Sequence, residues 1–145
     1  MTDSDFSLHP QLAADTVLLG DWPLSRLLLM NDAQYPWVVL VPRRAGLREI
    51  YELTAADQQQ LYAESLALGR LLMEVFAGHK LNVGALGNVV SQLHVHHVVR
   101  QPDDKAWPAP VWGKYPAVAY EAAALAALRA RLAPRLAALW PLLQA

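Results

Sequence analysis

Three of the five histidines in the chain, His94, His96 and His97, lie within the segment QLHVHHVVR at residues 92–100. Side chains along a β-strand point alternately to its two faces, so a strand here would place Gln92, His94 and His96 on one face. His97 would then point to the other face. Two imidazoles and an amide in line are unusual for packing alone. Three interpretations are open: a metal site, nucleophilic catalysis, or histidines held by hydrogen bonds in a structural role.

A metal site is the weakest of the three interpretations. The His-x-His pattern on a strand can chelate zinc, but a zinc site needs a third or fourth ligand. The chain has no cysteine, its other histidines, His9 and His79, are isolated, and no carboxylate has an obvious ligand spacing. We therefore expect no metal and no other cofactor.

Nucleophilic catalysis suits the cluster better. An imidazole nitrogen is largely unprotonated near neutral pH and can attack phosphorus directly. Neighbouring side chains would orient the ring and help to protonate the leaving group. Backbone amides and nearby Arg or Asn side chains would hold the phosphate oxygens, where charge develops. The structural role ranks below catalysis, because three histidines cluster after a Gly-Asn turn.

The composition limits the classes of partner. The 145 residues suggest a single domain, and 12 Lys and Arg against 13 Asp and Glu give a net charge of -1. This balance argues against a broad surface for nucleic acid polymers. The N-terminus, MTDSDFSLHP, lacks an apolar signal core, and no apolar run is long enough to span a bilayer. We expect a cytoplasmic protein that binds neither a nucleic acid polymer nor a membrane.

The first half of the chain predicts β-strands. Residues 16–20 and 24–30 flank Asp21-Trp22-Pro23, a plausible turn between antiparallel strands. After the turn-forming residues 31–36, the apolar run 37–41 reads as a central strand that ends at a proline.

The middle of the chain predicts a long helix followed by two more strands. Thr54 and Asp57 are spaced as a capping box, and Gly78 can provide a left-handed stop. Residues 80–86 and 93–99 are the next strand candidates. The order of these elements predicts an α+β domain with an antiparallel sheet of about five strands.

The chain changes character after Arg100. Residues 101–116 read as a loop, and the Ala- and Leu-rich residues 120–143 predict a helix that Pro134 should kink or split. We expect this helix to pack on the domain or on a partner subunit. The domain would then have a core at about 16–112 and a helical extension at about 118–144.

The histidine segment resembles the mark of the histidine-triad (HIT) family, His-φ-His-φ-His-φ-φ, which follows a Gly-Gln turn and precedes an Arg. If Gln92 takes the first place, His94 is central and His96 is third. Gly87-Asn88 and Arg100 then fall on the family's turn and Arg. The other register, with His94 first, leaves Val98 in the third place, so the two anchors favour the Gln92 register.

Other segments extend this resemblance over roughly Thr16 to Trp112. Asn82-Val83-Gly84 is similar to the family's Asn-x-Gly, and the segment from Trp37 to Arg44 resembles its His-φ-φ-φ-φ-Pro-Lys-Lys. Asn31-Asp32 stands where the family contacts ribose, and Trp107-Pro108 is similar to the Trp-Pro ending of one branch.

The resemblance implies a nucleotide hydrolase or nucleotidyl transferase that forms a homodimer and needs no metal. His94 would attack the α-phosphate of a dinucleoside polyphosphate or nucleoside phosphoramidate and form a nucleotidyl-histidine. His96 and Gln92 would support it. The substrate-binding candidates are Asn31, Asp32, Asn82, Asn88, Arg100 and Trp107.

Two positions depart from the family's pattern. Gln92 replaces the first triad histidine, and Trp37 replaces the upstream histidine that contacts it. Glutamine can orient a neighbour but cannot titrate, so we interpret the two replacements as a paired change. The alternatives to an enzyme are a nucleotide-binding module without turnover and, less favoured, a metal-binding domain that uses His94, His96 and His97.

Overall fold

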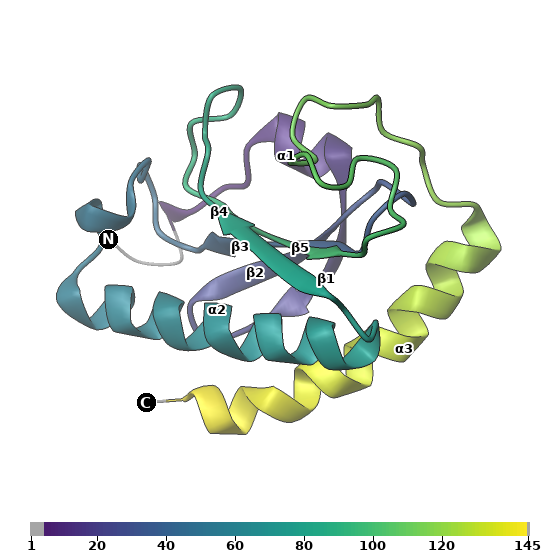
Figure 1. The fold of residues 1–145 in the computed structure, drawn as a ribbon. Coiled ribbons are helices and arrows are strands. Elements are labelled where there is room, and N and C mark those ends of the chain that lie inside the picture. Colours follow the sequence, from purple (N-terminus) through teal and green to yellow (C-terminus); the bar gives the residue numbers. More distant parts are fainter. Residues whose placement is uncertain (1–4, 145) are drawn as a thin grey trace.

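The structure is a computed structural model that describes residues 5–144 (Figure 1). Three helices, a short 3₁₀ turn and five strands follow one another along the described chain. Their order is α1 (Pro10–Asp15), β1 (Thr16–Asp21), β2 (Ser25–Met30), β3 (Trp37–Pro42), η2 (Ile50–Glu52), α2 (Ala55–Val75), β4 (Lys80–Gly84), β5 (Val95–Arg100) and α3 (Ala122–Leu143).

The five strands form one sheet in the order β1-β2-β3-β5-β4, and every neighbouring pair is antiparallel. The α+β prediction with about five strands is therefore confirmed. The last two strands have different bounds from those expected, because β4 ends at Gly84 and β5 begins only at Val95. Residues 85–94 form a long loop between them, and His94 lies in this loop, next to the strand.

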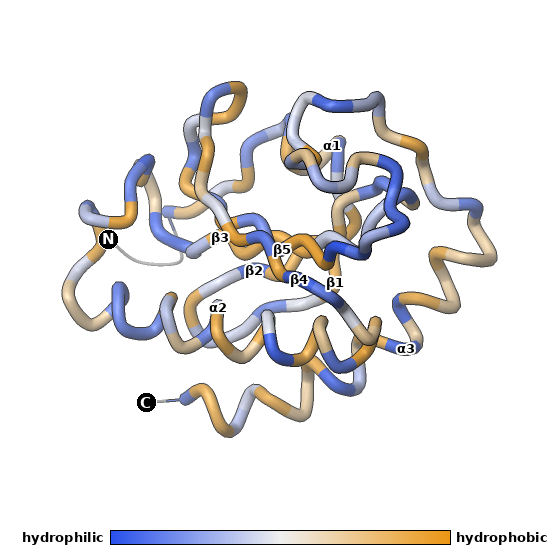
Figure 2. The backbone as a smooth tube through the Cα atoms, in the orientation of Figure 1, coloured by the Kyte–Doolittle hydropathy of each residue, from blue (hydrophilic) through white to orange (hydrophobic). Residues whose placement is uncertain are grey.

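One face of the sheet is covered by α2 and α3 (Figure 1). Figure 2 shows the central strands as mostly hydrophobic, whereas α2 alternates between hydrophobic and hydrophilic positions, as a helix with one buried side does. Thr54 caps α2 by accepting a hydrogen bond from the amide of Asp57, as the sequence predicts. The carboxylate of Asp57 does not reach back to complete a capping box; it forms an ion pair with Arg44 at 2.9 Å.

The end of α2 differs from the expected stop. The residue in the left-handed conformation is Ala77, with a φ of 47°, and not Gly78. Gly78 is required for a different reason: a Cβ there would lie 2.5 Å from the sulfur of Met73 and 2.6 Å from Val99. The glycine allows the chain to pass closely under β5.

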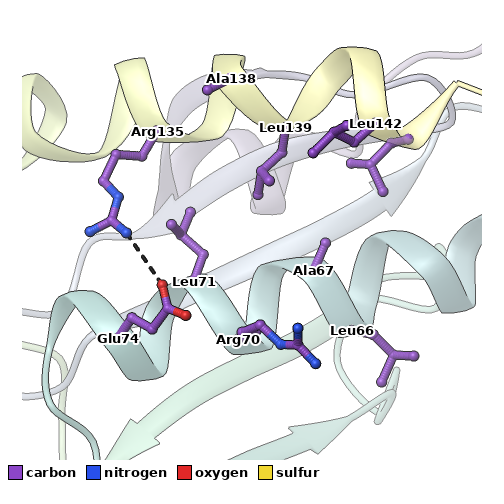
Figure 3. A pocket seen from close by; sticks show the side chains of 10 residues that line it. Leu66, Ala67, Arg70, Leu71, Glu74, Arg135, Ala138, Leu139 and Leu142 are labelled. Atoms are coloured by element: carbon purple, nitrogen blue, oxygen red, sulfur yellow. Dashed lines mark hydrogen bonds and ion pairs between the residues drawn. The ribbon is translucent and has the colours of Figure 1, made fainter.

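The C-terminal helix α3 runs continuously through Pro134, so the proline does not split it. Its Leu132 and Leu136 are buried in the same core as α2, and the backbone carbonyl of Leu136 accepts a hydrogen bond from the Trp22 indole at 2.8 Å. Figure 3 shows the groove between α2 and α3, where Arg135 pairs with Glu74 at 3.3 Å. The helix therefore packs on its own domain.

The opposite face of the sheet is covered by the N-terminal segment, α1 and the loop that follows β5 (Figure 1). A smaller core lies here, to which Leu12 of α1, Trp37 of β3 and Val98 of β5 contribute. Helix α1 is not predicted from the sequence, because six residues with a single buried side chain show no helical periodicity. Over residues 5–144, no helix has the length and apolar character needed to cross a membrane.

Candidate functional site

A cavity of about 590 Å³ opens on the loop-covered face of the sheet. Its walls come from α1, the end of β2, the first residue of β3, the loop 85–94, the start of β5 and the loop after β5. The residues that line it are Gln11, Leu12, Asp15, Met30, Trp37, Leu86, Gly87, Asn88, Val89, Val90, His94, His96, Trp112 and Gly113. Two of the three clustered histidines therefore share one cavity.

His94 is buried at the base of this cavity, and its ring orientation is fixed by the backbone. Its Nδ1 lies 2.6 Å from the carbonyl oxygen of Gln92. A carbonyl oxygen only accepts hydrogen bonds, so Nδ1 must carry the proton and Nε2 must carry the lone pair. Among residues 5–144, no group hydrogen-bonds this Nε2. In the neutral form of the ring, Nε2 therefore carries a lone pair that is free to act as a nucleophile.

His96 lies beside His94, with their ring centroids 4.8 Å apart. The indole N–H of Trp37 donates to Nδ1 of His96 at 3.0 Å. Burial, and then the nearby His94 and His97, lower the pKa of His96 from 6.5 to about 3. His96 is therefore neutral at physiological pH.

Gln92 does not line the cavity that holds the two histidines. Its side-chain oxygen accepts from the amide of His9, and its side-chain nitrogen donates to the carbonyl of Ser7, each at 2.8 Å. Trp37 hydrogen-bonds to His96 and not to Gln92, and the interpretation of the two replacements as a paired change stays a prediction. The amide of Gln92 fastens the segment that leads into α1, one wall of the cavity.

His97 points to the helix-covered face, as the strand alternation predicts. It is completely buried; its Nε2 lies 2.7 Å from the hydroxyl of Ser65, and its Nδ1 lies 3.1 Å from the carbonyl of Val95. Burial lowers the pKa of His97 to about 4, against the opposing effect of its backbone hydrogen bonds. Both ring nitrogens are engaged, so His97 has a structural role.

The loop 85–94 brings Asn88 to the rim of the cavity. Gly87 precedes it with a φ of 73°, a left-handed conformation that favours glycine. Asn88 is exposed and lines the cavity.

Asn31 and Asp32 line a neighbouring cavity of about 310 Å³. The two cavities share Asp15, Met30, Trp37 and Gly113, so they adjoin. Both side chains also hydrogen-bond to the backbone. The side-chain oxygen of Asn31 accepts from the amide of Tyr120, and one carboxylate oxygen of Asp32 accepts from the amide of Gln34.

Three substrate-binding candidates are not brought to the histidines. The guanidinium of Arg100 is buried and donates to Asp104 at 2.8 Å, to the side chain of Asn82 at 2.9 Å and to the carbonyl of Ala109 at 2.8 Å. The guanidinium carbon of Arg100 lies 5.6 Å from the centroid of the Trp107 ring, so the two side chains pack together. Neither cavity is lined by Arg100, Asn82 or Trp107. The binding roles that the sequence suggests for these three residues stay predictions, and the structure shows them holding the chain outside both cavities.

Several residues of the cavity were missed. Trp112, not Trp107, stands over His96, with ring centroids 5.6 Å apart. Gln11, Leu12 and Asp15 enter through α1, for which the sequence gives no local signal. Within residues 5–144, no group of three or more metal-ligating side chains is close enough to hold an ion. The three-histidine metal site is wrong, since His97 faces the other side of β5.

Comparison with known proteins finds a matching family model and similar solved structures. The protein-family model for the HIT domain matches residues 11–103 of the chain. A histidine triad protein from Marinobacter aquaeolei VT8 shares 55% sequence identity with a TM-score of 0.90, over 92% of this chain and 98% of that one.

Two further crystal structures are similar. A histidine triad protein from Bradyrhizobium japonicum shares 43% identity (TM-score 0.89; 91% of this chain, 98% of that one). One from Sinorhizobium meliloti 1021 shares 38% identity (TM-score 0.88; 90% and 97%). No curated protein matches the chain. The family model and these three structures agree, and the chain belongs to the HIT domain family.

Proposed function

We propose that this protein is a nucleotide hydrolase or nucleotidyl transferase in which His94 is the nucleophile. Membership of the HIT family supports a nucleotide hydrolase or transferase type of function in general. The observation that carries the assignment to His94 is its hydrogen bond to the Gln92 carbonyl at 2.6 Å. This bond keeps the proton on Nδ1 and the lone pair of Nε2 free for attack.

In the first step, Nε2 of His94 forms a bond to the α-phosphorus while the bond from phosphorus to the leaving group breaks with its electron pair. His96 donates a hydrogen bond from its own Nε2 to a phosphate oxygen, where negative charge develops. In the second step, the oxygen of water attacks phosphorus and the P–N bond breaks. The electron pair of the P–N bond returns to Nε2 of His94, the attacking water releases one proton to the solvent, and a nucleoside monophosphate leaves.

The two adjoining cavities provide room for the nucleoside. Leu12, Met30 and Val90 give the larger cavity an apolar wall suited to a base. Asn31 and Asp32, in the smaller cavity, are candidates for the ribose hydroxyls. Asn88 is the candidate for the phosphate side. Dinucleoside polyphosphates and nucleoside phosphoramidates are the substrate classes that this arrangement would accept.

We propose further that the chain forms a homodimer through β4. This strand is an edge of the sheet, and an unpaired edge is a template for pairing with a second strand. Val83 on β4, together with Leu86 and Val89 in the loop after it, is exposed. Sedimentation velocity of wild type and Val83→Lys tests this, because a monomeric wild type would contradict it. A Gln-for-His branch and a cytoplasmic location remain predictions.

The test of function is turnover of a small panel by wild type, His94→Ala and the control His79→Ala, a histidine outside both cavities. The panel holds adenosine phosphoramidate, diadenosine tri- and tetraphosphate and a nucleotide sugar. Intact mass after a rapid acid-free quench should reveal a nucleotidyl adduct in wild type. We expect His94→Ala to lose turnover by at least about 1,000-fold and to keep nucleotide binding. Binding without turnover in all three proteins would favour a nucleotide-binding module.

A further inference from the structure

Two tryptophans lie against the ring of His96 at the same distance but make different contacts. The ring centroids of Trp37 and Trp112 are each 5.6 Å from that of His96. Only Trp37 hydrogen-bonds to it, through its indole N–H at 3.0 Å. The indole N–H of Trp112 is buried and has no partner among residues 5–144. Trp37 alone therefore determines what the Nδ1 atom of His96 can do.

An indole N–H is a donor only, so the nitrogen that receives it must carry a lone pair. We propose that Trp37 is a positioning residue that locks His96 in the tautomer with the lone pair on Nδ1 and the proton on Nε2. His96 then meets a substrate as a fixed, neutral hydrogen-bond donor and not as a carrier of protons.

The surroundings of His96 also disfavour a charged ring. Trp37 and Trp112 cover it from β3 and from the loop after β5, and His94 and His97 are its titratable neighbours on its own segment. Burial and these two histidines lower the pKa of His96 to about 3. The other titratable side chain that lines the cavity is Asp15, whose carboxylate accepts from Gln11 at 2.9 Å.

This inference rests on the proposed function for its consequence, which concerns the leaving group. A neutral imidazole that gave up its Nε2 proton would become an imidazolate, so His96 cannot protonate a departing amine near neutral pH. A phosphate leaving group needs no proton, because it departs as a stable anion that keeps the electron pair of the broken P–O bond. The site is therefore built for phosphoanhydrides, such as dinucleoside polyphosphates, over phosphoramidates.

The tautomer can be read directly in the intact, ligand-free chain. Two-dimensional ¹⁵N–¹H correlation of the histidine rings distinguishes a protonated from an unprotonated nitrogen. In wild type we expect His96 to show a protonated Nε2, an unprotonated Nδ1 and no titration between about pH 5 and 8. This measurement needs no substitution, and a protonated Nδ1 in wild type would overturn the proposal.

Two variants separate positioning from packing. Trp37→Phe keeps an aromatic ring but removes the donor, so the His96 signals should become a mixture of tautomers with a higher pKa. Trp112→Phe removes a tryptophan at the same distance that donates nothing to His96, so the tautomer should stay as in wild type. Equal spectra for Trp37→Phe and wild type would contradict the role of the indole N–H.

The inference about the leaving group is tested by comparing kcat/KM for diadenosine triphosphate with kcat/KM for adenosine phosphoramidate. We expect wild type to favour the anhydride, and Trp37→Phe to shift the ratio toward the phosphoramidate by about tenfold or more. An unchanged ratio would overturn the leaving-group inference. If wild type turns over neither substrate, the proposed function fails, while the ring spectra still decide whether Trp37 sets the tautomer of His96.

Discussion

His96 and His97 are adjacent in sequence and buried on opposite faces of the same strand, yet they serve different purposes. Burial lowers the pKa of both, to about 3 and about 4. His97 has both ring nitrogens engaged, by Ser65 and by the carbonyl of Val95. His96 has only Nδ1 engaged, by Trp37, and its other nitrogen has no partner among residues 5–144. The free ring nitrogen in the cavity distinguishes His96, to which we assign a role in the proposed function, from His97; the lowered pKa does not distinguish them.

The same contrast applies to the two faces of the sheet. The helix-covered face buries a continuous apolar core from α2, α3 and the strands, which stabilises the fold. The loop-covered face is closed by α1, the loop 85–94 and the loop after β5, and it carries the cavities with His94, His96, Asn31 and Asp32. Loops on a rigid sheet are where binding groups concentrate. Substitutions in the core of the helix-covered face should therefore lower stability, and substitutions in the cavities of the loop-covered face should lower activity.

The largest effect that we expect is a loss of stability in mild acid. Unfolded histidines titrate near pH 6.5, whereas His96 and His97 in the fold resist protonation down to about pH 3 and 4. The unfolded chain therefore binds more protons in this window, and stability rises with pH. As pH falls below about 6.5, the free energy of unfolding should drop by about 1.4 kcal/mol per pH unit for each histidine.

Urea unfolding at a series of pH values above about 4.5, where most carboxylates stay ionised, measures this slope. His97→Leu should remove about half of the slope, because His96 still contributes. A slope that is the same in wild type and His97→Leu would show that His97 is protonated in the fold as readily as in the unfolded chain. Only His96 would then have a lowered pKa.

Arg100 tests the stabilising part of the loop-covered face. Burial raises the pKa of Asp104, but hydrogen bonds from Arg100 and from the amides of Gln101 and Trp107 outweigh it and bring that pKa below its usual range. Arg100→Met leaves this buried carboxylate unpaired, so we expect a loss of about 3 kcal/mol or more in the free energy of unfolding. The exposed Arg129→Met, measured by the same denaturant unfolding, should cost under about 1 kcal/mol. Unchanged stability with lost nucleotide affinity would return Arg100 to the binding site.

The sequence predicts well what depends on local pattern. The alternation at His96 and His97 separates the two faces of β5, and turn residues and apolar runs mark the first three strands. These signals are local because side-chain direction follows backbone geometry within a few residues.

The sequence predicts poorly what depends on distant partners. Gln92 and His9 are 83 residues apart, and Trp37 and His96 are 59 apart, so no periodicity links them. Arg100 shows the same limit. Its charge and position in the sequence suit a phosphate, but in the fold its guanidinium donates hydrogen bonds to Asn82 and Asp104. A cation near a site is available to a ligand only if no buried carboxylate holds it.

His96 and His97 themselves give the sharpest test of the comparison. His96→Ala removes the donor that faces the phosphate, so kcat should fall about 100-fold, as for the loss of one oxyanion donor. His97→Leu should change kcat by less than about threefold, since its ring does not reach the cavity. Steady-state turnover of a dinucleoside polyphosphate, corrected for the folded fraction, measures both. Equal losses would mean that the strand as a whole, and not one face, sets the activity.

Among the variants that should change the site, the smallest effect is expected at Gln92, which supports the cavity without lining it. Gln92→Ala removes two hydrogen bonds to Ser7 and His9, each worth about 1 kcal/mol. The segment that enters α1 should then open more often, and its amides should exchange with deuterium faster by about tenfold. Gln101→Ala is the matched control, because it also removes two hydrogen bonds between a Gln side chain and the backbone, here to the carbonyls of Phe76 and Ala77, far from α1. Faster exchange in the Gln92 variant alone, with only a severalfold loss of kcat/KM, would confirm that Gln92 acts by holding the segment that forms one wall of the cavity. A loss of turnover as large as that of His94→Ala would instead place its amide in the chemistry.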